Sequence, residues 1–127
     1  MSLSQRDLQL VQYILKHCDE IADVIYMCNE KENFLANHIY KNATAMALQT
    51  ISENSRSLSD EFTAGNPLIP WKELKGIRNI FAHAYDTRID FEIIWDSINE
   101  EIPVIADMCR NILKDNGIEP LKIDKAD

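Results

Sequence analysis

Apolar side chains recur every three or four residues along two long stretches in the first half of the chain. In residues 4–29 they fall at Leu8, Val11, Ile14, Leu15, Cys18, Ile21, Ile25 and Cys28. In residues 37–58 they fall at Ile39, Ala43, Met46, Ala47, Ile51 and Leu58. This spacing is typical of a helix with one buried face. Since Ser4 and Asp7 also offer a capping box, we predict two long helices, the first beginning at residue 4.

The second half of the chain predicts two more helices. Residues 59–67 have turn chemistry, and Pro70 suits the first turn of a shorter helix that ends near His83. The inward positions of that helix are Trp71, Leu74, Ile77 and Phe81. A last helix begins at Asp90, is expected to kink at Pro103, and is stopped by residues 116–117. Its apolar positions are Phe91, Ile94, Trp95, Ile98, Ile102, Ile105, Cys109, Ile112 and Leu113.

Composition agrees with an all-α fold. The chain has 127 residues, enough for one domain with its own core. Only 3 Gly and 4 Pro argue against a many-stranded sandwich, and no glycine-rich phosphate loop is present in the sequence. We predict an up-and-down bundle of four helices, with a possible short fifth, in residues 1–116, followed by a loosely ordered tail in residues 117–127.

Charge and cysteine content restrict the function further. A net charge of −8 argues against a protein that coats nucleic acid nonspecifically, so any such role must be local. The longest apolar run spans only five residues, 24–28, and residues 1–6 contain no apolar signal core, which predicts a cytoplasmic protein. The three cysteines occupy apolar-stripe positions and are interpreted as small buried hydrophobic residues. His17 and His38 stand alone, so no metal site is predicted.

One window differs from this acidic background. Residues 71–90 carry a net charge of +1, whereas the other 107 residues carry −9. The same window gathers Arg78, Asn79, His83 and Tyr85 within eight residues. On a helix, Arg78 and His83 lie about 140° apart, so a long guanidinium stem can reach the imidazole. A site that also includes Tyr85 requires the helix to end between residues 83 and 85.

Arg78, His83 and Tyr85 match the R-x-x-x-x-H-x-Y signature of the HepT-like toxins of the HEPN superfamily, which the chain resembles over about residues 4–115. Three further stretches resemble family landmarks, and they follow the usual order along the chain: residues 48–53, residues 69–71 and Trp95. One departure is Ser52, where a glycine is expected before Glu53. That departure concerns helix packing more than catalysis.

The resemblance implies a homodimeric, all-helical HEPN domain that cuts RNA without a metal or other cofactor, at a cleft formed by two copies of the motif. It further implies the toxin of a toxin–antitoxin pair. Its partner would be a nucleotidyltransferase of the MNT type that transfers AMP to Tyr85 and thereby silences the nuclease. Glu53 would lie near the cleft and hold Arg78.

The chemistry can also be argued from the residues. Cleavage through the RNA 2′-hydroxyl needs a base, an acid for the 5′-oxygen and positive charge on the phosphoryl group. His83 and its symmetry copy suit the first two roles, and Arg78 suits the third. Asn79 would orient the phosphate or His83, and the expected product is a 2′,3′-cyclic phosphate. Additional phosphate contacts, or simply exposed helix charges, are expected at Lys72, Lys75 and Arg88.

Two other interpretations stay open. The same pocket could bind nucleotide phosphates in a non-catalytic HEPN module that works with a nucleotidyltransferase. Alternatively, the chain could be a helical scaffold in which the motif is accidental, since an Arg-x-x-x-x-His spacing often arises by chance. Loss of RNA cleavage or of toxicity in His83→Ala separates the nuclease from both.

Overall fold

The computed structural model describes residues 4–82 and 89–124, and within these ranges the chain forms six helices and no strand. They are α1 (Gln5–Cys28), α2 (Lys31–Leu35), α3 (His38–Ser57), α4 (Asp60–Gly65), α5 (Trp71–Ala82) and α6 (Phe91–Asp115). The prediction of an all-α bundle is confirmed. The four helices predicted from periodicity are α1, α3, α5 and α6, and each lies within a few residues of its expected range.

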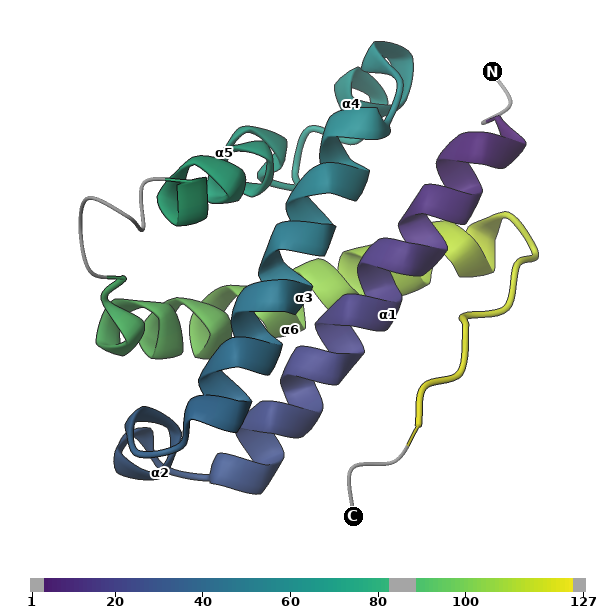
Figure 1. The fold of residues 1–127 in the computed structure, drawn as a ribbon. Coiled ribbons are helices and arrows are strands. Elements are labelled where there is room, and N and C mark those ends of the chain that lie inside the picture. The colour runs from purple at the N-terminus through teal and green to yellow at the C-terminus, as the bar shows by residue number, and fades with distance from the viewer. Residues whose placement is uncertain (1–3, 83–88, 125–127) are drawn as a thin grey trace.

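Figure 1 shows α1 and α3 side by side and antiparallel, with α6 crossing behind both. The short α2 connects α1 to α3 at one end of the pair, and α4 follows α3 at the other. Helix α5 packs against α3 on the side away from α1. The end of α6 and residues 116–124 lie on the opposite side of the molecule from α5.

The core is formed by most of the predicted apolar positions of α1, α5 and α6 and by part of the predicted stripe of α3. Residues 14, 18, 21, 51 and 109 are fully buried, and all three cysteines are buried thiols, as predicted. The two tryptophans are core anchors, each 7% exposed. Each tryptophan packs against a phenylalanine from a short helix: Trp95 lies 5.1 Å from Phe34 of α2, and Trp71 lies 5.7 Å from Phe62 of α4, between ring centroids.

On α3 the prediction is wrong for Ile39, Ala43 and Met46, which are exposed. The buried face of that helix instead includes small polar residues, which a hydrophobic period does not count: Thr44, Ser52 and Ser55.

Residues 59–67 were predicted to be turn, but they contain the helix α4. Ser59 caps this helix by accepting a hydrogen bond from the backbone N–H of Phe62 at 3.1 Å. Phe62 is fully buried, so the packing of one side chain fixes a helix that is too short to show a hydrophobic period. Tertiary contact therefore overrides local turn chemistry in this segment.

Both ends of α6 are as predicted. Asp90 caps its start by accepting hydrogen bonds from two backbone N–H groups. The helix continues through Pro103 and ends before Gly117, whose φ of +69° is the left-handed conformation that favours glycine. The backbone N–H of Ile118 then donates to the carbonyl of Leu113 at 2.9 Å, which closes the helix end. The expected domain boundary at residue 116 stays a prediction.

Candidate functional site

The site is built on α5, which has a buried face and an exposed face. Trp71, Leu74 and Phe81 are buried, as predicted, and the indole N–H of Trp71 donates to the carbonyl of Asn66 at 2.9 Å. The exposed face carries Lys72, Arg78 and Asn79. The amphipathic pattern of the sequence therefore fixes which side of α5 presents the motif arginine.

Arg78 is held by an acidic residue of the neighbouring helix. Its Nη1 lies 3.3 Å from Oε1 of Glu53 on α3, and the two side chains are 56% and 57% exposed. An ion pair this exposed contributes at most about 1 kcal/mol to stability. Its main effect is therefore to restrict the position of a guanidinium that stays accessible to an anionic ligand.

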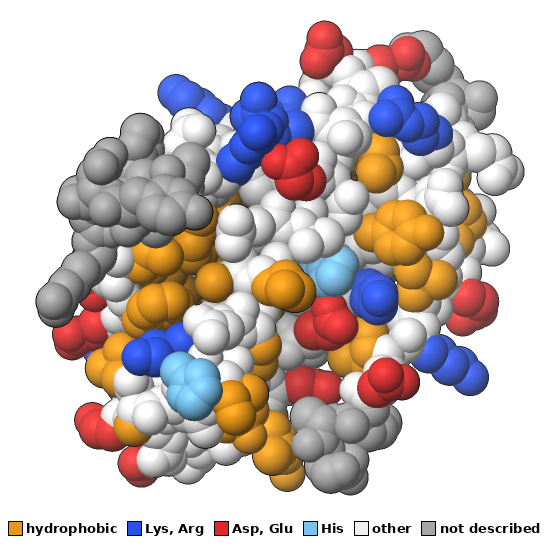
Figure 2. Space-filling view, viewed as in Figure 1, with side chains coloured by type: hydrophobic (Ala, Val, Ile, Leu, Met, Phe, Trp, Pro, Cys, Tyr) orange, Lys and Arg blue, Asp and Glu red, His pale blue; other side chains and the backbone are white. Residues whose placement is uncertain are grey.

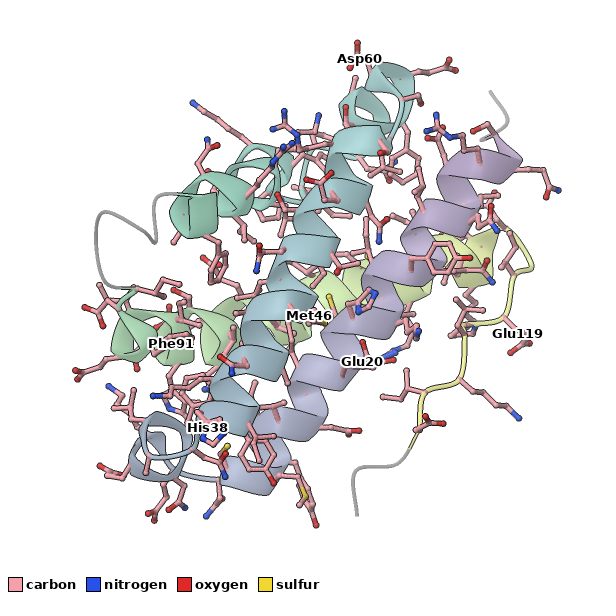
Figure 3. The ribbon with its side chains drawn as sticks, in the orientation of Figure 1. Glu20, His38, Met46, Asp60, Phe91 and Glu119 are labelled. Atoms are coloured by element: carbon pink, nitrogen blue, oxygen red, sulfur yellow. The ribbon has the colours of Figure 1, made fainter. Side chains whose placement is uncertain are left out.

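Beside this pair is an open hollow of about 640 Å³ between α3 and the exposed face of α5. Its lining residues are Asn42, Ala45, Met46, Gln49, Thr50, Glu53 and Arg78. Figure 3 shows Met46 on the outer face of α3, and its side chain is 71% exposed. The hollow combines the Arg78–Glu53 ion pair, amide and hydroxyl groups and the apolar side chains of Ala45 and Met46. A cation, polar groups and apolar surface are groups that can contact a nucleotide.

Lys and Arg side chains gather over α5 and the adjoining end of α3 in the space-filling view, although the whole chain is acidic (Figure 2). Lys72 is exposed on this face and Lys75 is half-buried. The local positive charge expected from the sequence is thus on the same face as Arg78.

The opposite face of α5 borders a second, apolar cavity of about 210 Å³ between α5 and α6. Its apolar lining comprises Leu48, Pro70, Leu74, Ile77, Ile80, Phe81, Ile93, Ile94, Ile98, Ile102 and Ile105. Ile80 and Ile93 at its rim are 56% and 62% exposed. Helix α5 therefore lies between a polar hollow and an apolar one.

Sequence reasoning did not identify one residue of this region as part of the site. Ser52 is fully buried on α3, and its hydroxyl donates to the carbonyl of Lys75 at 3.0 Å and accepts from the backbone N–H of Arg78 at 3.2 Å. Both partners are backbone atoms, so no pairing of residue types in the sequence could have indicated this link. The only signal was a polar residue next to Ile51 on the buried stripe of α3.

The structure brings Arg78 and Glu53 together. Asn79 is also exposed on α5, but it lies about 100° further round the helix and does not line the hollow beside Arg78. His83, Tyr85 and Arg88 lie outside the described residues, so their predicted places in the site stay predictions. No group of three or more His, Cys, Asp or Glu side chains arranged to hold a metal ion occurs in residues 4–82 and 89–124. In the same part of the chain, no helix is long and apolar enough to cross a membrane.

Comparison with known proteins identifies the family. The family described as "Ribonuclease HepT-like" matches residues 14–112. This chain belongs to the HepT-like family of the HEPN superfamily. "Putative RNase MJ1380" of Methanocaldococcus jannaschii is 33% identical over 104 residues, which cover 81% of this chain and 94% of that protein. A second protein of that organism, "Putative RNase MJ1216", is 31% identical over 89% of this chain and 93% of its own length.

A HepT-like relative from another organism carries the family name itself. "Probable ribonuclease HepT" of Thermococcus cleftensis is 30% identical over 68% of this chain and 84% of its own length. No solved structure matches the chain. The resemblance read from the Arg78 motif is therefore confirmed at the level of the family.

Proposed function

We propose that the chain is a metal-independent endoribonuclease that acts as a homodimer, with two copies of the motif forming one cleft. The observation that carries this proposal is the accessible Arg78 guanidinium, held by Glu53 at the edge of a polar hollow in a member of a ribonuclease family. A guanidinium offers the fork of N–H donors that a phosphate binds best. A scissile phosphate would lie over Arg78, with flanking nucleotides along the hollow.

The proposed reaction uses the ribose as its own nucleophile. His83 of one copy removes the 2′-hydroxyl proton, and the 2′-oxygen forms a bond to phosphorus. The bond from phosphorus to the 5′-oxygen breaks, and the second copy of His83 donates a proton to that oxygen. Arg78 stabilises the charge that develops on the phosphoryl oxygens, and Asn79 orients the phosphate or His83. The products are a 2′,3′-cyclic phosphate and a 5′-hydroxyl.

The proposed biological role is that of the toxin in a HepT/MNT toxin–antitoxin pair. An MNT-type nucleotidyltransferase would transfer AMP from ATP to the hydroxyl of Tyr85, two residues from His83: the tyrosine oxygen bonds to the α-phosphorus and pyrophosphate leaves. The added phosphate is negatively charged and bulky, so it would repel and exclude the RNA phosphate without a change of fold. Lys75 and Arg88 would extend the contact with the RNA backbone, each by neutralising a phosphate.

The test uses purified protein whose intact mass confirms an unmodified Tyr85. Wild type, His83→Ala and Arg78→Ala are incubated with RNA in the presence of chelator, and the fragment ends are analysed. Arg6→Ala serves as the control, because Arg6 is an exposed arginine on α1. We expect cleavage by wild type and by the control, with cyclic phosphate ends, and a loss of at least about a hundredfold in the two motif variants, as is usual when a general base or a charge-stabilising donor is removed.

A mixing experiment tests the composite cleft. If each site needs a histidine from both copies, a molar excess of His83→Ala protein should suppress wild-type activity by forming mixed dimers. Activity that stays proportional to the wild-type concentration would contradict a shared site. Absence of cleavage by folded, dimeric, unmodified wild type, together with binding of ATP that requires Arg78, would favour the nucleotide-binding module instead.

A further inference from the structure

We propose that Ser52 is a positioning residue that sets the place of Arg78 by fixing α5 on α3. This inference rests on the proposed function for its kinetic consequence, but its structural part can be tested separately. Ser52 does not face the hollow in which RNA would bind, since its side chain is fully buried. It would act only through the helix backbone that carries Arg78.

The hydroxyl of Ser52 makes two hydrogen bonds across the helix interface. It donates to the carbonyl of Lys75 at 3.0 Å and accepts from the N–H of Arg78 at 3.2 Å. These two backbone groups lie three residues apart, on one turn of α5. A shift of α5 by one residue means a rise of about 1.5 Å and a rotation of about 100°, which would break both bonds.

Glu53, which follows Ser52 on α3, contacts the side chain of the same arginine, Arg78. Glu53 contacts the guanidinium of Arg78 at 3.3 Å, while Ser52 contacts its backbone N–H. Two consecutive residues of α3 therefore contact the same arginine, one at its backbone and one at its guanidinium. In the described residues, the side-chain polar links between α3 and α5 are this ion pair and the two hydrogen bonds of Ser52.

The surroundings of α5 make this link important. The helix packs on α3, whereas the apolar cavity of about 210 Å³ separates it from much of α6. Packing mainly on one neighbouring helix allows small sliding movements of a helix. A displacement of about 1 Å in a residue that holds substrate can reduce turnover a hundredfold. A buried pair of directional bonds at the turn of Arg78 restricts this movement.

Ser55 provides a matched control for the experiment. It is also a fully buried serine on α3, but its hydroxyl donates to the carbonyl of Ile51 within its own helix at 2.8 Å. Ser52→Ala and Ser55→Ala thus remove the same atom from the same helix at the same burial. Only the first removes a link to α5.

The first measurement is hydrogen exchange of the Arg78 backbone N–H by NMR in the three proteins. We expect exchange at least about fivefold faster in Ser52→Ala than in Ser55→Ala, because the N–H loses a partner and the helix gains local freedom. Equal exchange rates in the two variants would overturn the inference. Ser52→Cys, which keeps the side-chain size but is a much weaker hydrogen-bond partner, gives the same comparison if the alanine variant does not fold.

The second measurement is RNA cleavage. We expect kcat to fall about tenfold in Ser52→Ala with KM changed less than about twofold, because the loss concerns the placement of Arg78 in the transition state. Ser55→Ala should stay within about twofold of wild type in both constants. Equal losses in the two variants would overturn the positioning role. Absence of cleavage by wild type would contradict the proposed function, while the exchange comparison would still decide whether Ser52 positions α5.

Discussion

Asp7 on α1 accepts two hydrogen bonds from Ser59 at the start of α4, one from the backbone N–H at 2.9 Å and one from the hydroxyl at 2.7 Å. A third comes from the hydroxyl of Ser4 at 2.8 Å. Each of these serines also caps its own helix. One buried carboxylate therefore joins the beginnings of two helices that are more than fifty residues apart in sequence.

The pKa of Asp7 makes this junction sensitive to acid. Burial acts to raise the pKa, but the hydrogen bonds from Ser59 and Ser4 and the charge of Arg6 outweigh it, so the pKa lies below its ordinary value. The ionised form is thus favoured by folding. Its contribution is complete above the unfolded pKa of about 3.9 and is lost as the pH falls through the lower folded value.

We expect Asp7→Asn to lower the free energy of unfolding by about 1–3 kcal/mol at pH 7, since buried hydrogen bonds to a charged group are lost. The difference from wild type should shrink below about pH 4, where the wild-type carboxylate itself becomes protonated. Urea titrations at pH 7, 5 and 3 measure this, with the exposed Asp107→Asn as control. A difference that is constant across this pH range would contradict the role of the charge.

Gly76 lies within α5, and a Cβ at this position would meet no atom within 4 Å. We expect Gly76→Ala to stabilise the protein by about 0.5–1 kcal/mol, because alanine restricts the unfolded chain more and favours helix. Gly117→Ala is the contrasting variant: it has the same open space but a φ of +69°, so it should destabilise the protein by about 1 kcal/mol. Thermal unfolding of both variants checks the opposite signs.

Phe34 is fully buried against Trp95 and lies 6.2 Å from Phe91 between ring centroids. Because α2 has only five residues, this packing is what stabilises it. We expect Phe34→Ala to cost about 3–5 kcal/mol of unfolding free energy. Ile39→Ala, at a side chain that is 64% exposed, should cost less than about 1 kcal/mol. Similar losses in the two variants would show that α2 is not held by its phenylalanine.

The cysteines should report on opening of the core. Burial raises the pKa of Cys109 to about 12 and also raises the pKa values of Cys18 and Cys28. The reactive thiolate is therefore scarce at pH 8, and the thiols are also inaccessible. We expect iodoacetamide to label the native protein far more slowly than the urea-unfolded chain, which should take up three labels by intact mass. Rapid labelling of a native thiol would indicate local unfolding of α1 or α6.

The helices that could be predicted from the sequence are the long ones, in which the repeat of apolar residues along the helix itself indicates the structure. The stripes of α1 and α6 repeat over many turns, so their buried faces could be assigned without knowledge of their partners. The face of α3 was assigned only in part, because Ile39 and Met46 are exposed while Thr44 and two serines are buried. Helices α2 and α4 contain five and six residues and depend on Phe34 and Phe62 packing against tryptophans elsewhere in the chain. Such short segments show no period, and their structure follows from tertiary contact.

The residues of the candidate site also differ in how well the sequence could identify them. Arg78 was identified by its spacing from His83, and Glu53 by the family resemblance. Ser52 was interpreted only as a packing departure, because its partners are a carbonyl and an N–H that every residue possesses. A sequence can show that side-chain chemistry is present, but it does not show which backbone groups a buried hydroxyl will meet across a helix interface.

The placement of the described chain ends has a practical consequence for labelling. Ser4 begins α1 and residues 116–124 follow α6, so both ends lie on the side of the bundle away from α5. A fluorophore or affinity tag attached at either end would therefore stand clear of Arg78. Donor- and acceptor-labelled copies could then be mixed to test by energy transfer whether two copies associate as proposed, with the Arg78 region left unlabelled.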